Sequence, residues 1–120
     1  MTGPDLCQRL TTAVLNSSFS FSCELDLQKG LAQLFDELEI PYERERLLAG
    51  TDRIDFFLGE GLGLEVKIQE SLTSVTRQLH RYAQHPDIVE LVLVTTKTAH
   101  RRMPEAMCEK PVQVIYLNPF

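Results

Sequence analysis

The sequence predicts an α/β or α+β domain in which one mixed β-sheet is flanked by helices. Apolar residues recur at helical spacing over 24–38, two short apolar runs flank a glycine-containing turn at 59–61, and residues 88–96 are nearly all apolar. A run like the last is typical of a central strand that is buried on both faces. The 120 residues, 43% of them hydrophobic, fit one globular domain. We expect a core at 23–117 that follows an N-terminal extension at 1–22.

The first part of the chain is expected to supply two helices and an edge strand. A short helix is expected at 5–15 and a clearly amphipathic one at 24–38. Ser22 stands where it can cap the start of the second helix, and Pro41 marks its end. Residues 42–48 alternate in polarity, which is typical of an extended strand near the edge of a sheet.

Residues 53–58 and 62–68 are expected to pair as a β-hairpin. If the turn is centred on Glu60, one face of the hairpin carries only apolar pairs and therefore belongs to the core. These pairs are Leu58 with Leu62, Phe56 with Leu64, and Ile54 with Val66.

The opposite face of this hairpin carries the candidate chemistry. Asp55 lies opposite Glu65, with Lys67 two positions further along the same side. Carboxylates that face each other at about 5 Å repel one another, unless a cation lies between them. Mg²⁺ prefers oxygen ligands and takes one or two carboxylates, so the Val66 carbonyl is a further candidate ligand. Lys67 could position an attacking water or stabilise charge that develops on phosphorus. The alternative is an ordinary solvated strand face.

The last part of the chain is expected to complete the sheet. A second amphipathic helix is predicted at 71–85 and ends before Pro86. The apolar run at 88–96 is the central strand. A short helix at 98–107 and a last strand at 112–117 follow.

Charge is distributed unevenly along the chain. The net charge of −5 argues against a protein that coats nucleic acid through charge alone. Residues 1–70 hold 13 acidic and 6 basic residues, whereas residues 71–120 hold 4 acidic and 6 basic residues. The acidic part is therefore the candidate for holding a metal ion, and the remainder is the candidate for facing phosphate.

Five residues in the second part are candidates for contact with nucleic acid. Arg77 and Arg81 share one side of the predicted helix at 71–85. Lys97, Arg101 and Arg102 cluster with His100 after the central strand, where we expect a loop. Such residues supply the usual phosphate contacts, although a simply solvated surface remains the alternative for both groups.

These residues together resemble the PD-(D/E)XK nuclease superfamily, in its RecB-like, phage exonuclease or resolvase branch. Asp55 matches the first acid of the motif, and Glu65 to Lys67 match its E-x-K element. Gln78 and Tyr82 match the Q-x-x-x-Y element of that branch. The sequence departs from the motif at Ile54, where the proline of the name would stand.

The resemblance implies a single restriction-endonuclease-like domain with the core order αβββαβ. It implies that Asp55 and Glu65 bind Mg²⁺ or Mn²⁺ and that Lys67 assists catalysis. Gln78 and Tyr82 would lie beside the site, Gln78 with the catalytic residues and Tyr82 toward the nucleic acid. Many members of the superfamily present a further acid from the first helix. Glu24 is the best candidate for that role and Asp26 the second, while Asp52 is a rival of Asp55 for the metal.

The expected function is therefore metal-dependent hydrolysis of phosphodiesters, with DNA as the expected partner. The protein is expected to act as a homodimer or within a larger complex. Endonuclease and exonuclease activity both stay open. The alternatives are a catalytically silent DNA-binding protein on the same fold and a protein-interaction module. The N-terminus has neither a basic segment nor an apolar one typical of a secretory signal, and no run is apolar enough to span a bilayer. A cytoplasmic location is expected.

Overall fold

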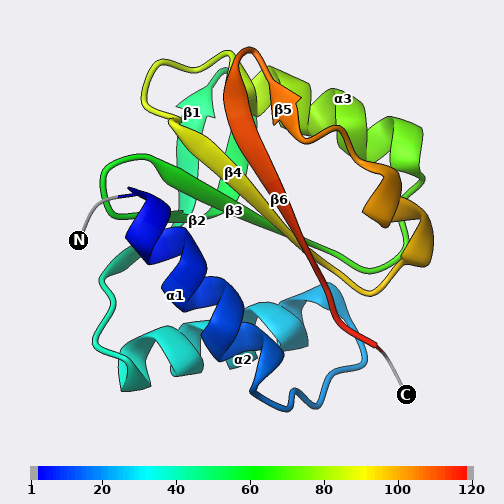
Figure 1. The fold of residues 1–120 in the computed structure, drawn as a ribbon. Coiled ribbons are helices and arrows are strands. Elements are labelled where there is room, and N and C mark those ends of the chain that lie inside the picture. Colours follow the sequence, from blue (N-terminus) through cyan, green and yellow to red (C-terminus); the bar gives the residue numbers. More distant parts are fainter. Residues whose placement is uncertain (1–2, 119–120) are drawn as a thin grey trace.

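A computed structural model describes residues 3–118, so residues 1–2 and 119–120 of the expected domain lie outside it. The described residues form three α-helices, one short 3₁₀-helix and a six-stranded mixed sheet (Figure 1). This confirms the expected mixture of helices and strands. The elements in order are α1 (Gly3–Leu15), α2 (Glu24–Glu37), β1 (Tyr42–Ala49), β2 (Asp52–Leu58), β3 (Leu62–Lys67), α3 (Leu72–Ala83), β4 (Glu90–Thr95), η1 (Thr98–Arg102), β5 (Ala106–Met107) and β6 (Lys110–Tyr116).

The sheet has the strand order β1-β2-β3-β4-β6-β5. Strands β1, β2 and β3 form an antiparallel meander, and β3, β4 and β6 run parallel to one another. The expected edge position of the first strand is confirmed. Strand β4 is central, and its residues from Leu91 to Thr95 are all buried. A parallel pair needs a crossover connection, and α3 provides it between β3 and β4.

Helices cover both faces of the sheet (Figure 1). Helices α1 and α2 lie on one face and α3 lies on the other. On the first face Leu10, Leu31 and Phe35 pack against inward-facing residues of β2, β3 and β4. On the second face Val75 and Leu79 of α3 pack against Leu91 and neighbouring residues. These alternating sheet residues explain why the central strand reads as a continuous apolar run.

Two local expectations were wrong. Ser22 does not cap α2; the capping position belongs to Cys23, and Ser22 instead donates to the Asp26 carboxylate from its backbone N–H and its hydroxyl, at 3.1 and 2.9 Å. The helix expected at 98–107 stops as a 3₁₀-helix at Arg102. Pro104 follows, and because proline lacks an N–H and clashes with a preceding helical turn, the chain leaves the helix and forms β5.

No helix among residues 3–118 is both long enough and apolar enough to cross a membrane.

Candidate functional site

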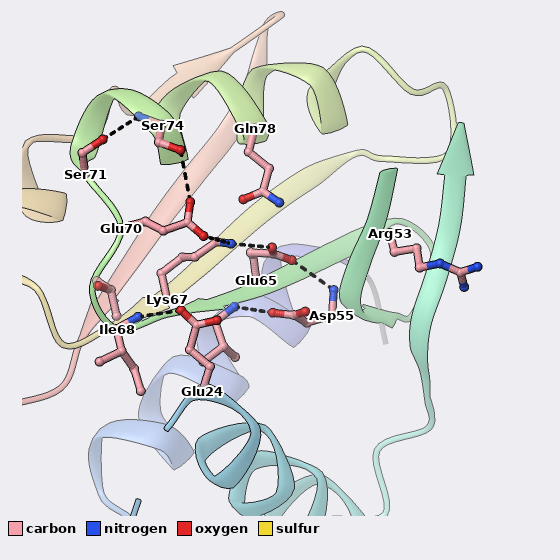
Figure 2. A network of polar contacts seen from close by, with 12 residues as sticks. Glu24, Arg53, Asp55, Glu65, Lys67, Ile68, Glu70, Ser71, Ser74 and Gln78 are labelled. Atoms are coloured by element: carbon pink, nitrogen blue, oxygen red, sulfur yellow. Dashed lines mark hydrogen bonds and ion pairs between the residues drawn. The ribbon is translucent and has the colours of Figure 1, made fainter. Parts of the chain in front are cut away.

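The candidate site lies where strands β2 and β3 separate. The predicted register holds for Leu58 with Leu62, Phe57 with Gly63, and Phe56 with Leu64, and the backbone pairing ends there. Beyond that point side chains replace the ladder (Figure 2). The Asp55 N–H donates to Glu65 Oε1 at 3.1 Å, and the Val66 N–H donates to Asp55 Oδ2 at 2.7 Å. The two carboxylates therefore satisfy backbone donors that a continuous sheet would have paired.

The face assigned to Ile54 was wrong. We expected it beside Phe56 on the wholly apolar face, but Ile54 packs on the α3 side of the sheet while Phe56 packs on the α1 and α2 side. The alternation of sides thus breaks between them, at Asp55. Glu45, which lies beside this break on β1, has a left-handed φ of 51°. The break turns the Asp55 carboxylate across toward β3.

Lys67 is held between two carboxylates (Figure 2). Its Nζ lies 3.1 Å from Glu70 Oε1 and 3.4 Å from Glu65 Oε2. Lys67 is 6% exposed and Glu65 is 2% exposed, so this ion pair is largely removed from water. Glu70 is more exposed and also accepts a hydrogen bond from the Ser74 hydroxyl of α3 at 3.1 Å.

Helix α2 contributes a further acid. Glu24 begins α2, and its Oε1 accepts a hydrogen bond from the Ile68 N–H at 3.1 Å, just beyond the end of β3 (Figure 2). The structure therefore brings Glu24 beside the hairpin, as the resemblance implied. Asp26, the second candidate, is half-buried and instead accepts hydrogen bonds from Ser22.

Burial and mutual repulsion determine the protonation of the paired carboxylates. Burial, reinforced by the charge of Asp55, raises the pKa of Glu65 to about 8. Burial also raises the pKa of Asp55, against the hydrogen bond from Val66 and the charge of Lys67. Burial lowers the pKa of Lys67, but Glu65 and Glu70 outweigh it, so that pKa lies above its ordinary value. Lys67 thus stays an ammonium, while the carboxylates are held where ionisation is costly.

The donor set fits a hard cation with few protein ligands. Within residues 3–118 no three His, Cys, Asp or Glu side chains are placed to hold one metal ion together. The carboxylates that could supply ligands are those of Asp55 and Glu65, with Glu24 nearby, and each of the three also accepts a hydrogen bond from a backbone N–H. Mg²⁺ usually keeps several waters and binds through one or two carboxylates plus substrate phosphate. The role of the Val66 carbonyl stays a prediction.

Gln78 and Tyr82 adjoin the site from α3. Gln78 Nε2 donates to the Tyr82 hydroxyl at 2.8 Å, and that hydroxyl donates to the Arg53 carbonyl at 2.8 Å. Tyr82 is 1% exposed, so it supports the site from inside the fold instead of lying open to nucleic acid. Gln78 points from α3 toward Glu65 (Figure 2), and its buried Oε1 has no hydrogen-bond partner among the described residues.

The two arginines on α3 differ in their partners. Both line a groove of about 420 Å³ that also includes Glu70, Ser74 and Gln78. Arg77 is exposed and forms no hydrogen bond or ion pair within the described part of the chain. Arg81 is paired with Asp52 at 3.2 Å, so Asp52, the rival metal ligand, is directed to an arginine on α3.

The basic cluster after β4 is divided by the fold. Lys97 Nζ donates to the Gln69 carbonyl at 3.1 Å, Arg101 stacks over the Tyr116 ring at 5.2 Å, and Arg102 is exposed. His100 does not share their solvent-facing setting, since it is fully buried. Sequence reasoning missed Glu70 as a partner of Lys67, although a carboxylate three residues after the E-x-K lysine was a visible signal.

Comparison with protein-family models, with curated proteins and with solved structures found no match.

Proposed function

We propose that this protein is a metal-dependent nuclease with a restriction-endonuclease-like fold. The observation that carries the proposal is the arrangement of Asp55, Glu65 and Lys67 where β2 and β3 separate. A structural sheet gains nothing from a buried and a half-buried carboxylate with raised pKa values, and perturbed titratable groups of this kind concentrate at functional sites. The element order α2-β1-β2-β3-α3-β4 also agrees with the core order of the superfamily that the motif resembles.

Asp55 and Glu65 would hold Mg²⁺ or Mn²⁺, with Glu24 beside them. The ion would supply a Lewis acid for the scissile phosphodiester. It would also offset the negative charge that Asp55 and Glu65 carry when they ionise, which their burial disfavours. A phosphate would otherwise be repelled from these carboxylates.

The chain's own residues would orient the reaction. Lys67 stays protonated and is fixed by two carboxylates, so it can stabilise charge on a phosphoryl oxygen without reorganising. Gln78 Oε1, which has no partner among the described residues, is available to accept a hydrogen bond from water or substrate. Arg77 is free to contact a phosphate of the nucleic-acid backbone, for which we propose DNA.

The experiment is cleavage of a labelled panel of linear, circular, single-stranded and branched DNA with Mg²⁺ or Mn²⁺. The test variant is Lys67→Met, which keeps the apolar stem, and the control is Lys29→Ala on exposed α2 surface. We expect EDTA to abolish cleavage and Lys67→Met to lower it by roughly 10²–10³-fold, the cost of one lost transition-state donor. Folded parent protein that binds DNA and cleaves none of these substrates would favour the catalytically silent alternative.

A further inference from the structure

His100 is buried at the centre of a hydrogen-bonded unit behind the candidate site. It is 0% exposed, its Nε2 lies 2.6 Å from the Glu70 carbonyl oxygen, and its Nδ1 lies 2.6 Å from Thr95 Oγ1. Thr95 ends β4 and is likewise 0% exposed. The unit therefore connects the end of β4 to the segment that follows β3.

A neutral imidazole satisfies every hydrogen bond of this unit. A carbonyl only accepts, so His100 Nε2 must carry the proton that goes to Glu70. The Lys97 N–H donates to Thr95 Oγ1 at 3.0 Å, which leaves the threonine hydroxyl free to donate to His100 Nδ1. Every polar atom named here is then satisfied by a neutral imidazole, as buried polar groups require.

The two residues after Thr95 hold the rest of the connection between β3 and α3. Lys97 Nζ donates to the Gln69 carbonyl at 3.1 Å, and the Thr96 hydroxyl donates to the Ile68 carbonyl at 3.4 Å. Glu70 contacts both His100 and Lys67. Its backbone carbonyl accepts from His100, and its carboxylate lies 3.1 Å from Lys67 Nζ. His100 thus holds the backbone of the residue whose carboxylate contacts Lys67.

We propose that His100 is a positioning residue that fixes Glu70 against Lys67. Glu70 has an exposed carboxylate, which accepts from the Ser74 hydroxyl and for which solvent competes with the lysine. With His100 in place, the lysine is restrained between Glu70 and Glu65 and keeps one orientation. The inference rests on the proposed function only where it predicts a catalytic effect, because the restraint itself is a property of the folded protein.

The test uses the NMR signal of the Lys67 ammonium in ¹⁵N-lysine-labelled protein, which requires no cleavage. The variants are His100→Leu, Glu70→Gln and the combination, with His80→Leu on the exposed outer side of α3 as the matched control. We expect His100→Leu to shift and broaden the signal as Glu70→Gln does. The combination should go no further than either single variant, because both act through one contact. His80→Leu should leave the signal unchanged.

A second pair of variants covers the case in which His100→Leu does not fold. Thr95→Val removes the hydroxyl that His100 Nδ1 accepts from, while Thr95→Ser retains it. We expect the valine variant to show the same altered Lys67 signal as His100→Leu and the serine variant to keep the signal of the parent protein.

Cleavage gives the catalytic readout. His100→Leu should lower kcat by roughly 10–100-fold, the usual effect of a supporting partner, with KM unchanged. The inference is overturned if Lys67 shows no protected ammonium signal in the parent protein, or if that signal is the same in the parent, His100→Leu and Thr95→Val proteins. An altered signal in a protein that cleaves nothing would retain the positioning role and reject the nuclease. Cleavage by the parent protein that His100→Leu leaves unchanged would retain the nuclease and reject a role of His100 in catalysis.

Discussion

Glu65 is the residue whose protonation most directly links the site to stability. Its pKa is raised by burial and by Asp55 to about 8, from a reference value of 4.5. Between these values the folded state binds the proton more tightly than the unfolded chain does. The free energy of unfolding contributed by Glu65 is therefore fully present below about pH 4.5 and is lost as the pH rises toward 8.

We thus expect the metal-free protein to become less stable between pH 5 and pH 8, and Glu65→Gln to flatten this dependence. Urea unfolding at several pH values, in EDTA, measures it. Stability that rises over the same interval in the parent protein would mean that Glu65 is ionised at little cost.

Asp55 should have opposite effects with and without metal. In EDTA at pH 8 we expect Asp55→Asn to raise stability by about 0.5–2 kcal/mol, because the charge is removed while an oxygen remains to accept from Val66. The same change should abolish any increase in melting temperature that Mg²⁺ causes, because a ligand is lost. Asp36→Asn, at an exposed position in the last turn of α2, is the control. An equal Mg²⁺ effect in Asp55→Asn and parent proteins contradicts this role.

At the residue scale the sequence predicts which side chains of the hairpin form the site, but it does not predict the contacts that hold them from other elements. Alternation and a short turn predict that Asp55, Glu65 and Lys67 come together. They do so in the structure, although the ladder ends at Phe56 and Leu64 and side-chain contacts take over from there. The contacts of Glu24 with Ile68 and of His100 with Glu70 join segments distant in sequence. No spacing rule encodes them, since they depend on how α2 and η1 pack against the sheet.

At the scale of single elements, strand β3 carries the site and is tightly enclosed. A Cβ added at Gly63 would clash with Ile54 Cδ1 and would lie 2.9 Å from Ile88 Cδ1. We expect Gly63→Ala to lower the free energy of unfolding by about 1–3 kcal/mol, the usual cost of overpacking. Urea denaturation, with exposed Ser20→Ala as the control, measures this. A neutral result would show that β3 has more space than the structure gives it.

Element types were predictable where the periodic pattern was long, as in α2, α3 and β4. The short segment at 98–107 was not, because its apolar spacing fits a helix while Pro104 and pairing with β6 favour β5. Tertiary pairing decided the outcome. The wrong face for Ile54 comes from a break that the sequence pattern does not show: the alternation is interrupted at Asp55, beside the left-handed Glu45 of the neighbouring strand.

At the scale of the whole molecule, the mixed sheet was predictable and its exact strand order was not. A helix between β3 and β4 predicts a parallel pair, because such connections cross over the sheet. Nothing local to β5 and β6 indicates that β6 lies beside β4 with β5 outside it. The exposed Arg77 lies on α3, on the opposite face of the sheet from α2.

Arg77 therefore provides a whole-molecule prediction about binding. We expect Arg77→Ala to weaken DNA binding to a similar extent for all sequences and to reduce the salt dependence, in log–log slope, by about 0.9. Lys29→Ala on α2 removes the same charge from the other face and should change neither quantity. Fluorescence anisotropy across salt concentrations measures both. Equal effects of the two variants would indicate a general charge effect instead of a contact at the groove.

The central claim is that Asp55 and Glu65 together form a divalent-cation site. The most direct measurement is a crystal structure determined in Mn²⁺, with anomalous scattering used to locate the ion. We expect an anomalous peak between the two carboxylates in the parent protein and none in Asp55→Asn crystals grown in the same solution. Well-ordered parent crystals with no peak at these carboxylates would contradict it.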